Sequence, residues 1–372
     1  MAASDSWPKH STEPYSDDST LDTVDIWLPR ASSSEDSNRL WVIYIHGGAW
    51  RDPAISATSF TPTLDKLSKS GVADQIAGYA SINYRLSPYP SHPTDPSDPS
   101  DPARNATHPD HINDVLAAIL SLQEKHHFED RYVLVGHSCG ATLAMQAAMK
   151  RYWGSQYEST FALELNVVPP KAILGVEGIY DMPAFVRNHE DQPIYKDFVH
   201  NAFGPSGWDA ASPTNGDYEE SWPDGELVVL AHSADDSLVE PEQASSMKDV
   251  LEAQDWNRSE RRQVKTFEVH GEHDEVWQTE EVARAIDWTL QQLQPSTSII
   301  QNVSLATTGE AELKVTSFGP EVESLAQSAV SSYLLRPHAV GRRLAGLSRV
   351  PDFWWTMGNA WGSQEREGNE RE

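Results

Sequence analysis

The sequence predicts an α/β fold with a mainly parallel central sheet covered by helices on both faces. Short runs of β-branched and aromatic residues alternate with longer segments in which apolar residues recur every three or four positions, the pattern of strands that alternate with helices. The strand-like runs are almost continuously apolar, which is typical of parallel strands buried on both faces. The 372 residues exceed an average domain, but single α/β domains of about 250 residues are ordinary.

The expected elements follow one another in regular alternation along the chain. We expect strands near residues 22–29, 39–45, 76–85, 131–136, 171–177, 226–231 and 263–269. We expect helices near residues 57–69, 110–125, 139–152, 241–254 and 275–293. In the helix 110–125 the apolar residues fall on one stripe, which predicts packing against the core: Ile112, Val115, Leu116, Ile119 and Leu120.

This pattern places one domain at residues 21–295, preceded by a flexible segment at 1–20. Residues 87–109 contain repeated Asp-Pro-Ser units. Proline lacks a backbone donor and cannot continue a helix or a central strand, so we expect a flexible surface insertion there. The strand and helix pattern ends near residue 295, and residues 296–372 are expected to form a partly disordered C-terminal extension.

The segment Gly136-His137-Ser138-Cys139-Gly140 matches a nucleophile elbow, Gly-x-Ser-x-Gly, at the end of the strand 131–136. In such an elbow the chain turns sharply from strand to helix and leaves the serine hydroxyl exposed. Ser138 is therefore the candidate nucleophile, and the backbone N–H of Cys139 can point at a developing oxyanion. His137 is expected to pack away from the hydroxyl.

A second motif, His46-Gly47-Gly48-Ala49-Trp50, follows the strand 39–45. A glycine-containing loop at this place supplies backbone N–H groups to an oxyanion hole in acyl-transfer enzymes. We therefore expect the N–H groups of Gly48 and Ala49 to join that of Cys139.

A serine nucleophile needs a base and an orienting carboxylate, and both occur in loops that follow later strands. After the strand 226–231, Asp236 is preferred to Asp235, which can be a turn residue. After the strand 263–269, His273 is preferred to His270, because His270 continues the strand. The order Ser, Asp, His is that of α/β-hydrolases.

These motifs, together with Asn83-Tyr84-Arg85-Leu86-Ser87-Pro88, resemble those of eukaryotic kynurenine formamidases of the α/β-hydrolase superfamily, most closely the fungal ones, over residues 22 to 295. The resemblance implies hydrolysis of N-formyl-L-kynurenine to L-kynurenine and formate in tryptophan degradation, which feeds nicotinamide cofactor synthesis. It implies the triad Ser138, Asp236 and His273. It also implies a small cap at residues 182–224 and makes Trp50, beside the oxyanion loop, a candidate substrate contact.

Composition limits the partners. The net charge is −28, from 28 basic and 56 acidic residues, and this charge disfavours nucleic acid and anionic membranes. The single cysteine excludes an intrachain disulfide. The sequence shows no secretory signal pattern and no apolar run of about 18 residues, so we expect a cytoplasmic protein.

The sequence thus predicts a serine hydrolase that acts by two-step acyl transfer on a small molecule. No metal and no organic cofactor is expected, and a homodimer is left open. The alternative is a carboxylesterase or lipase-like hydrolase of short acyl esters with the same triad. A second alternative is a hydrolase-fold binding module without catalysis, which the intact triad argues against.

Overall fold

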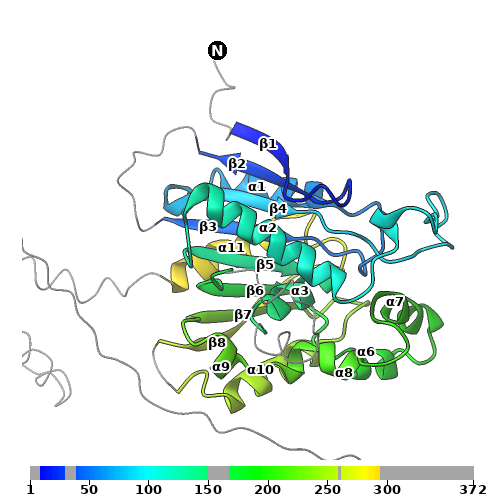
Figure 1. The fold of residues 1–372 in the computed structure, drawn as a ribbon. Coiled ribbons are helices and arrows are strands. Elements are labelled where there is room, and N and C mark those ends of the chain that lie inside the picture. Colours follow the sequence, from blue (N-terminus) through cyan, green and yellow to red (C-terminus); the bar gives the residue numbers. More distant parts are fainter. Residues whose placement is uncertain (1–8, 30–38, 150–166, 259–260, 294–372) are drawn as a thin grey trace, which may run out of the picture. The chain divides into compact units, whose positions relative to one another are not determined.

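The computed structural model describes residues 9–29, 39–149, 167–258 and 261–293 (Figure 1). These residues all belong to one unit, Met1–Thr297, defined by contacts within the chain. The expected extension at 296–372 lies outside the described residues. Within them, the chain forms an 8-stranded sheet in the order β1-β2-β4-β3-β5-β6-β7-β8.

The sheet is mainly parallel, as predicted. Its strands are β1 (Lys9–Pro14), β2 (Thr23–Leu28), β3 (Leu40–Ile45), β4 (Ile76–Ile82), β5 (Tyr132–His137), β6 (Ala172–Val176), β7 (Leu227–Ser233) and β8 (Gln263–Val269). Strand β2 pairs antiparallel with both β1 and β4, and the pairs from β4 through β3 to β8 are parallel. Because β3 and β5 to β8 run in the same direction, their carboxyl ends meet at one edge, where open α/β sheets bind ligands.

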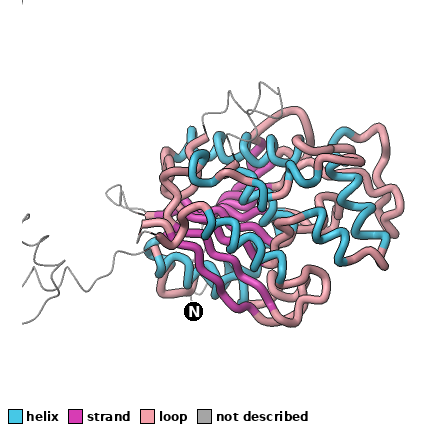
Figure 2. The backbone as a smooth tube through the Cα atoms, turned by 90° about the horizontal axis from the view of Figure 1, so that it is seen from below, coloured by secondary structure: helices cyan, strands magenta, loops and turns pink. Residues whose placement is uncertain are grey.

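Helices cover both faces of the sheet (Figure 2). One face is packed by α1 (Thr61–Leu67) and α11 (Glu281–Gln292), which contact each other. The opposite face carries α2 (Asp110–His126), α3 (Cys139–Ala147) and α10 (Glu242–Ala253). The buried side chains accordingly form two clusters, one on each side of the sheet, and the predicted α/β-hydrolase fold class is confirmed.

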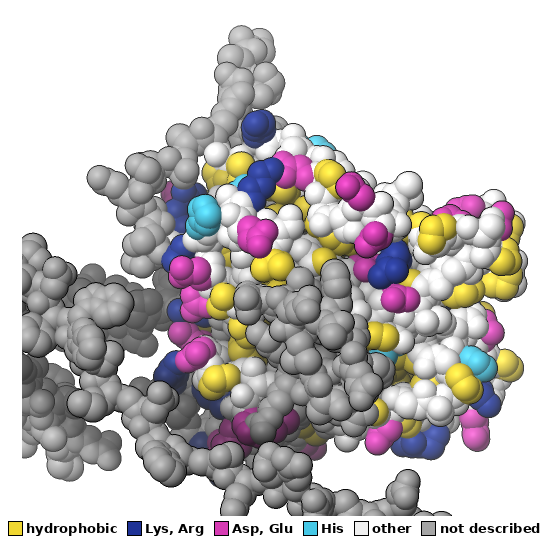
Figure 3. Space-filling model, viewed as in Figure 1, with side chains coloured by type: hydrophobic (Ala, Val, Ile, Leu, Met, Phe, Trp, Pro, Cys, Tyr) yellow, Lys and Arg dark blue, Asp and Glu magenta, His cyan; other side chains and the backbone are white. Residues whose placement is uncertain are grey.

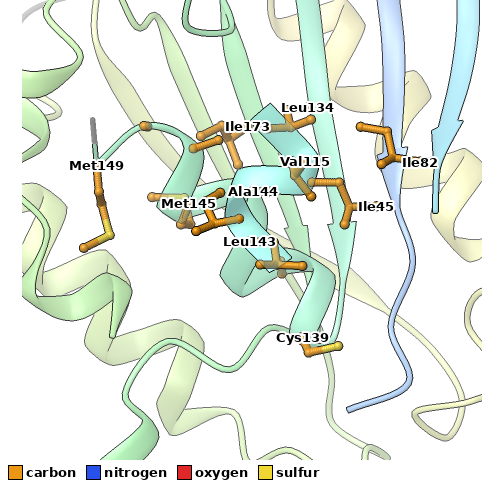
Figure 4. Close-up of a cluster of buried hydrophobic side chains, with 14 of the residues drawn as sticks. Ile45, Ile82, Val115, Leu134, Cys139, Leu143, Ala144, Met145, Met149 and Ile173 are labelled. Carbon is orange, nitrogen blue, oxygen red and sulfur yellow. The ribbon is translucent and has the colours of Figure 1, made fainter. Parts of the chain in front are cut away.

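Helix α3 is buried along its whole length. Figure 4 shows Leu143, Ala144 and Met145 of this helix among side chains from β3, β5, β6 and α2. Closely packed interiors resist displacement, and α3 begins directly after Ser138. The start of this helix is therefore a firm support for the residue that precedes it.

From residue 9 onward, the first strand corrects the expectation of a flexible segment over residues 1–20, and residues 1–8 lie outside the described residues. Lys9–Pro14 pairs with Thr23–Leu28 along its full length. Its side chains are exposed or half-buried, so the segment carries no apolar signal. Backbone hydrogen bonds to β2 hold this edge strand in place, and the side-chain pattern could not reveal them.

The insertion at residues 87–109 is also ordered, in contrast to the flexible segment we expected. Backbone hydrogen bonds join Leu86 to Ala103 at 2.8 Å and Ala106 to Leu86 at 2.9 Å. Arg104 Nη1 contacts Asp95 Oδ2 at 2.9 Å, and the short helix η3 (Pro102–Arg104) starts from an Asp101 side-chain cap. The prolines exclude a long helix or a central strand, but backbone and side-chain hydrogen bonds hold the segment in place.

The predicted cap region consists of short helices after β6 (Figure 1). They are α6 (Met182–Asn188), α7 (Pro193–Phe203), α8 (Trp208–Ala211), η4 (Pro213–Asn215) and α9 (Tyr218–Ser221). Two further short helices, η1 (Ala57–Phe60) and η2 (Ala73–Gln75), lie between β3 and β4.

None of the helices in the described ranges is long and apolar enough to cross a bilayer. On the face shown in Figure 3, acidic and basic side chains are interspersed.

Candidate active site

Ser138 lies at a sharp turn between β5 and α3. Its φ of 55° and ψ of −123° put a non-glycine residue in a strained conformation, of a kind that costs about 1–3 kcal/mol and is common at functional sites. The flanking glycines allow this turn. A Cβ at Gly136 would lie 2.2 Å from the carbonyl oxygen of Gly140, and one at Gly140 would lie 2.2 Å from that of Ile45.

The structure brings His273 and Asp236 together from the ends of two neighbouring strands. His273 Nδ1 lies 2.8 Å from Asp236 Oδ2, and both side chains are almost fully buried. The other oxygen of Asp236 accepts from the backbone N–H groups of Leu238 at 2.8 Å and Val239 at 2.9 Å. Burial raises the pKa of Asp236, but the hydrogen bond and charge of His273 outweigh this effect and lower it. Asp236 is thus held as the anion.

The alternative residues, Asp235 and His270, lie elsewhere. Asp235 is exposed, and its backbone N–H donates to Ser233 Oγ at 3.1 Å, which is the turn role considered for it. His270 is exposed beside Glu281, with its Nδ1 3.3 Å from Glu281 Oε2. In contrast, His273 lines the same cavity as Ser138.

The loop after β3 also reaches this cavity. Gly48 and Ala49 line the cavity with Ser138, and three successive residues have positive φ: Gly48 at 95°, Ala49 at 49° and Trp50 at 59°. These conformations turn the loop sharply at the cavity wall beside Ser138. The expected role of the Gly48 and Ala49 N–H groups as oxyanion donors stays a prediction.

Buried side chains hold the loop after β3 in place. The His46 ring stacks on Tyr84 with 4.4 Å between centroids, and its Nδ1 lies 2.8 Å from the carbonyl oxygen of Gly47. Burial lowers the pKa of His46 to about 4, so the ring is neutral. Cys139 Sγ accepts from the backbone N–H of Trp50 at 3.2 Å, and burial raises the pKa of the thiol to about 11. His46 and Cys139 therefore support the loop through uncharged side chains.

Trp50 does not contact the cavity through its side chain, which corrects our expectation of a substrate-binding residue. Its exposed fraction is 0%, and its ring packs edge-on against Phe203 with 5.0 Å between centroids. The Phe198 ring is also near, with 6.2 Å between centroids. The motif places the Trp50 backbone beside the oxyanion loop, but the ring joins this loop to the cap.

A second carboxylate, Glu177, was missed by the sequence reasoning. It follows β6 directly, is fully buried, and has its Oε2 3.5 Å from His273 Nδ1. Burial and the charge of Asp236 raise the pKa of Glu177 to about 9, so the side chain is a neutral acid at pH 7. An acidic residue at the carboxyl end of an apolar run was the signal that could have found it.

Glu177 also lies beside His137, which was expected to pack away from the hydroxyl. His137 Nε2 is 3.1 Å from the carbonyl oxygen of His273 and 3.4 Å from Glu177 Oε2. Burial lowers the pKa of His137 well below its ordinary value, so the neutral ring contacts the backbone of His273. Within the described residues, His137, Glu177 and His273 each present one possible metal-ligand atom, all within 4.8 Å of one another. A metal ion there would compete with Asp236 for His273 Nδ1.

The cavity has a volume of about 340 Å³, within the range of small-molecule sites. Its wall is largely apolar and aromatic, with contributions from Ile55, Ile179, Phe185, Tyr195 and Phe198. Its polar lining comprises Ser138, His273, Arg51 and Gln192, together with the carboxylates of Asp52 and Asp274. Aromatic walls with a few polar groups are typical of sites for drug-sized organic ligands.

Comparison with known proteins identifies the family of this chain. The BD-FAE family model matches residues 24–251. Kynurenine formamidase avaC of Aspergillus versicolor is 38% identical over 306 residues, which cover 75% of this chain and 99% of that protein. The chain belongs to the fungal kynurenine formamidase family of α/β-hydrolases.

Two further relatives support membership of the kynurenine formamidase family. Kynurenine formamidase-like hydrolase fscH of Fusarium equiseti is 43% identical over 70% of this chain and 86% of that protein. Kynurenine formamidase of Meyerozyma guilliermondii is 30% identical over 70% of this chain and 88% of that protein. The name kynurenine formamidase describes a hydrolase of a C–N amide bond.

Solved structures of lower identity share the fold. Esterase B from Lactobacillus rhamnosis superimposes with a TM-score of 0.56 at 16% identity, over 81% of this chain and 89% of that chain. A truncated carbohydrate esterase from gut microbiota gives a TM-score of 0.53 at 19% identity, over 78% of this chain and 98% of that chain. At these identities the likeness concerns the fold of the family alone.

Proposed function

We propose that this chain hydrolyses the formamide of N-formyl-L-kynurenine to L-kynurenine and formate. The observation that carries the proposal is the buried 2.8 Å contact between His273 Nδ1 and Asp236 Oδ2, at a cavity that also holds Ser138. The names of the relatives supply the substrate. The aromatic wall of the cavity suits the aryl ketone of this substrate.

In the first step, Ser138 Oγ attacks the formyl carbon while His273 Nε2 takes the hydroxyl proton. Asp236 holds Nδ1 of the same ring and stabilises the imidazolium that forms. The oxyanion accepts hydrogen bonds from the N–H groups of Gly48, Ala49 and Cys139. The C–N bond then breaks, and His273 returns the proton to the departing aryl amine.

The second step releases formate. His273 takes a proton from a water molecule, whose oxygen attacks the formyl carbon of the acyl-serine. The new oxyanion occupies the same donors, the ester bond breaks, and the proton passes back to Ser138 Oγ. The residues named here supply each proton transfer in both steps.

The test follows the disappearance of N-formyl-L-kynurenine absorbance with purified protein, beside Ser138→Ala and beside a short-chain aryl ester. We expect turnover of the formamide, and loss of that turnover in Ser138→Ala. Ester cleavage without formamide turnover would overturn the substrate and favour a carboxylesterase. Inactivity on both compounds would overturn the enzymatic reading and favour a binding module.

A further inference from the structure

Arg51 stands apart among the residues of the active-site cavity. Of the described residues that line this cavity, it is the one lysine or arginine. Its side chain is only 3% exposed, although charged side chains are rarely buried unless they are paired. It directly follows the His46–Trp50 motif, so the same loop carries the oxyanion donors and this cation.

Two segments hold the guanidinium in a fixed place. Arg51 Nη1 donates to Asp197 Oδ2 of α7 at 2.7 Å. The guanidinium carbon lies 4.0 Å from the ring centroid of Tyr89 and 5.7 Å from that of Phe198. Cation–π contacts of this kind stabilise a cation without using its hydrogen-bond donors. The group is therefore positioned before any ligand binds.

Most of the donors of Arg51 remain available. A guanidinium has five N–H donors in a planar fork, and Asp197 is the one acceptor that the described part of the chain offers to it by hydrogen bond. The Asp197 side chain is 53% exposed, so solvent screens its negative charge. The rest of the fork can bind a second carboxylate in bidentate geometry.

We propose that Arg51 binds the α-carboxylate of an aryl-ketone amino acid, with the aromatic ring of the ligand against the cap side chains Phe185, Tyr195 and Phe198. The proposal rests on the proposed function, and it adds the group that selects an amino acid over a neutral aryl formamide. A neutral ester or amide would gain less from a positioned guanidinium, because hydrogen bonds between two charged groups are roughly twice as strong as neutral ones. A merely structural Arg51 would instead join the oxyanion loop to α7 through Asp197, and the experiment must separate these roles.

The experiment compares kcat/KM for N-formyl-L-kynurenine and for its decarboxylated analogue, N-formylkynuramine, in the wild type and in Arg51→Met. A hydrogen bond to a charged group contributes an amount that corresponds to about a 10- to 100-fold change in binding. We expect the wild type to prefer the carboxylate by about this factor, mainly through KM. Arg51→Met should lose that preference. An unchanged ratio would overturn the proposal.

Two further variants guard against a purely structural effect. Asp197→Ala removes the acceptor that links Arg51 to α7 but leaves the cation in place, so it should keep or increase the preference for the carboxylate. If Asp197→Ala reduces the preference as much as Arg51→Met, the link and not the anion site is responsible, and the proposal fails. Arg51→Lys keeps the positive charge and should retain part of the preference for the carboxylate. It replaces Arg51→Met in the comparison if Arg51→Met does not fold.

Product binding separates this proposal from the proposed function. L-Kynurenine and kynuramine can be compared as inhibitors of hydrolysis of 4-nitrophenyl acetate. We expect L-kynurenine to inhibit the wild type at least about 10-fold more strongly than kynuramine does. This difference should be lost in Arg51→Met. If formamide turnover fails but this difference remains, only the reaction is wrong. If formamide turnover succeeds and both products inhibit equally, only the carboxylate site is wrong.

Discussion

Replacing Glu177 with glutamine should make the protein less sensitive to rising pH. Burial and the nearby Asp236 charge raise the pKa of Glu177 from 4.5 in the unfolded chain to about 9 in the fold. Between these values the native state binds more protons than the unfolded state. Its stability is therefore greatest below the lower value and falls as the pH rises toward the upper one. Glutamine resembles the neutral acid in shape and does not titrate.

The magnitude follows from the proton that the native state retains. One pKa unit corresponds to about 1.4 kcal/mol, so this one group lowers the free energy of unfolding by about 3 kcal/mol between pH 6 and pH 8. Titrating groups away from Glu177 contribute equally to the wild type and the variant, and over this pH range the native Glu177 is uncharged like the glutamine that replaces it. The difference between the two proteins thus isolates the contribution of Glu177.

The assay is urea unfolding at pH 6, 7 and 8 with the slope m held common. From pH 6 to pH 8, the free energy of unfolding of the wild type should fall by about 3 kcal/mol more than that of Glu177→Gln. Glu190 is exposed in the loop after α6, so Glu190→Gln serves as the matched control and should follow the wild type. Parallel pH dependence of the wild type and Glu177→Gln would refute the assignment of Glu177 as a neutral acid.

Three further outcomes are expected at the site. Asp236→Asn should lower kcat for the formamide by about 10⁴-fold, because His273 loses the anion that holds its tautomer; a loss of less than tenfold would argue that another group orients the ring. Cys139 has an exposed fraction of 0% and a pKa raised by burial to about 11. Iodoacetamide at pH 8 should therefore leave activity intact, and mass spectrometry checks that this thiol stays unlabelled. Gly140→Ala should lower the free energy of unfolding by about 3 kcal/mol, because its Cβ would lie 2.2 Å from the Ile45 carbonyl oxygen; a urea midpoint equal to that of the wild type would contradict this.

The strands β2 to β8 and the principal helices could be predicted because their signals are local. The run Tyr132–Val135 is apolar throughout and forms most of β5, and the stripe in residues 110–125 belongs to α2. The helix expected from 275 begins only at Glu281, since turns occupy the segment after His273. Local sequence gives the type of an element more reliably than its boundary.

The missed features depend on contacts between distant residues. Arg51 and Asp197 are 146 positions apart, so no motif around either one predicts their contact. The ring of Trp50 is buried by Phe203 of the cap, while the motif constrains only its backbone. Glu177 looks like an isolated charge in an apolar run until the sheet brings it beside His273. The sequence could place the motif loops at the carboxyl ends of the strands. The contacts of their side chains became visible only in the three-dimensional structure.

The surroundings of His273 favour a single negative charge. Burial keeps His137 neutral and Glu177 protonated, while Asp236 is held ionised by His273 and two backbone N–H groups. One carboxylate can stabilise the imidazolium that forms during attack. A second ionised carboxylate 3.5 Å from the same nitrogen would stabilise it further, because an adjacent opposite charge favours the protonated ring. The ring would then give up its proton less readily to the leaving amine. A neutral Glu177 thus keeps His273 able to act both as a base and as an acid, the two roles that the proposed reaction requires of it in turn.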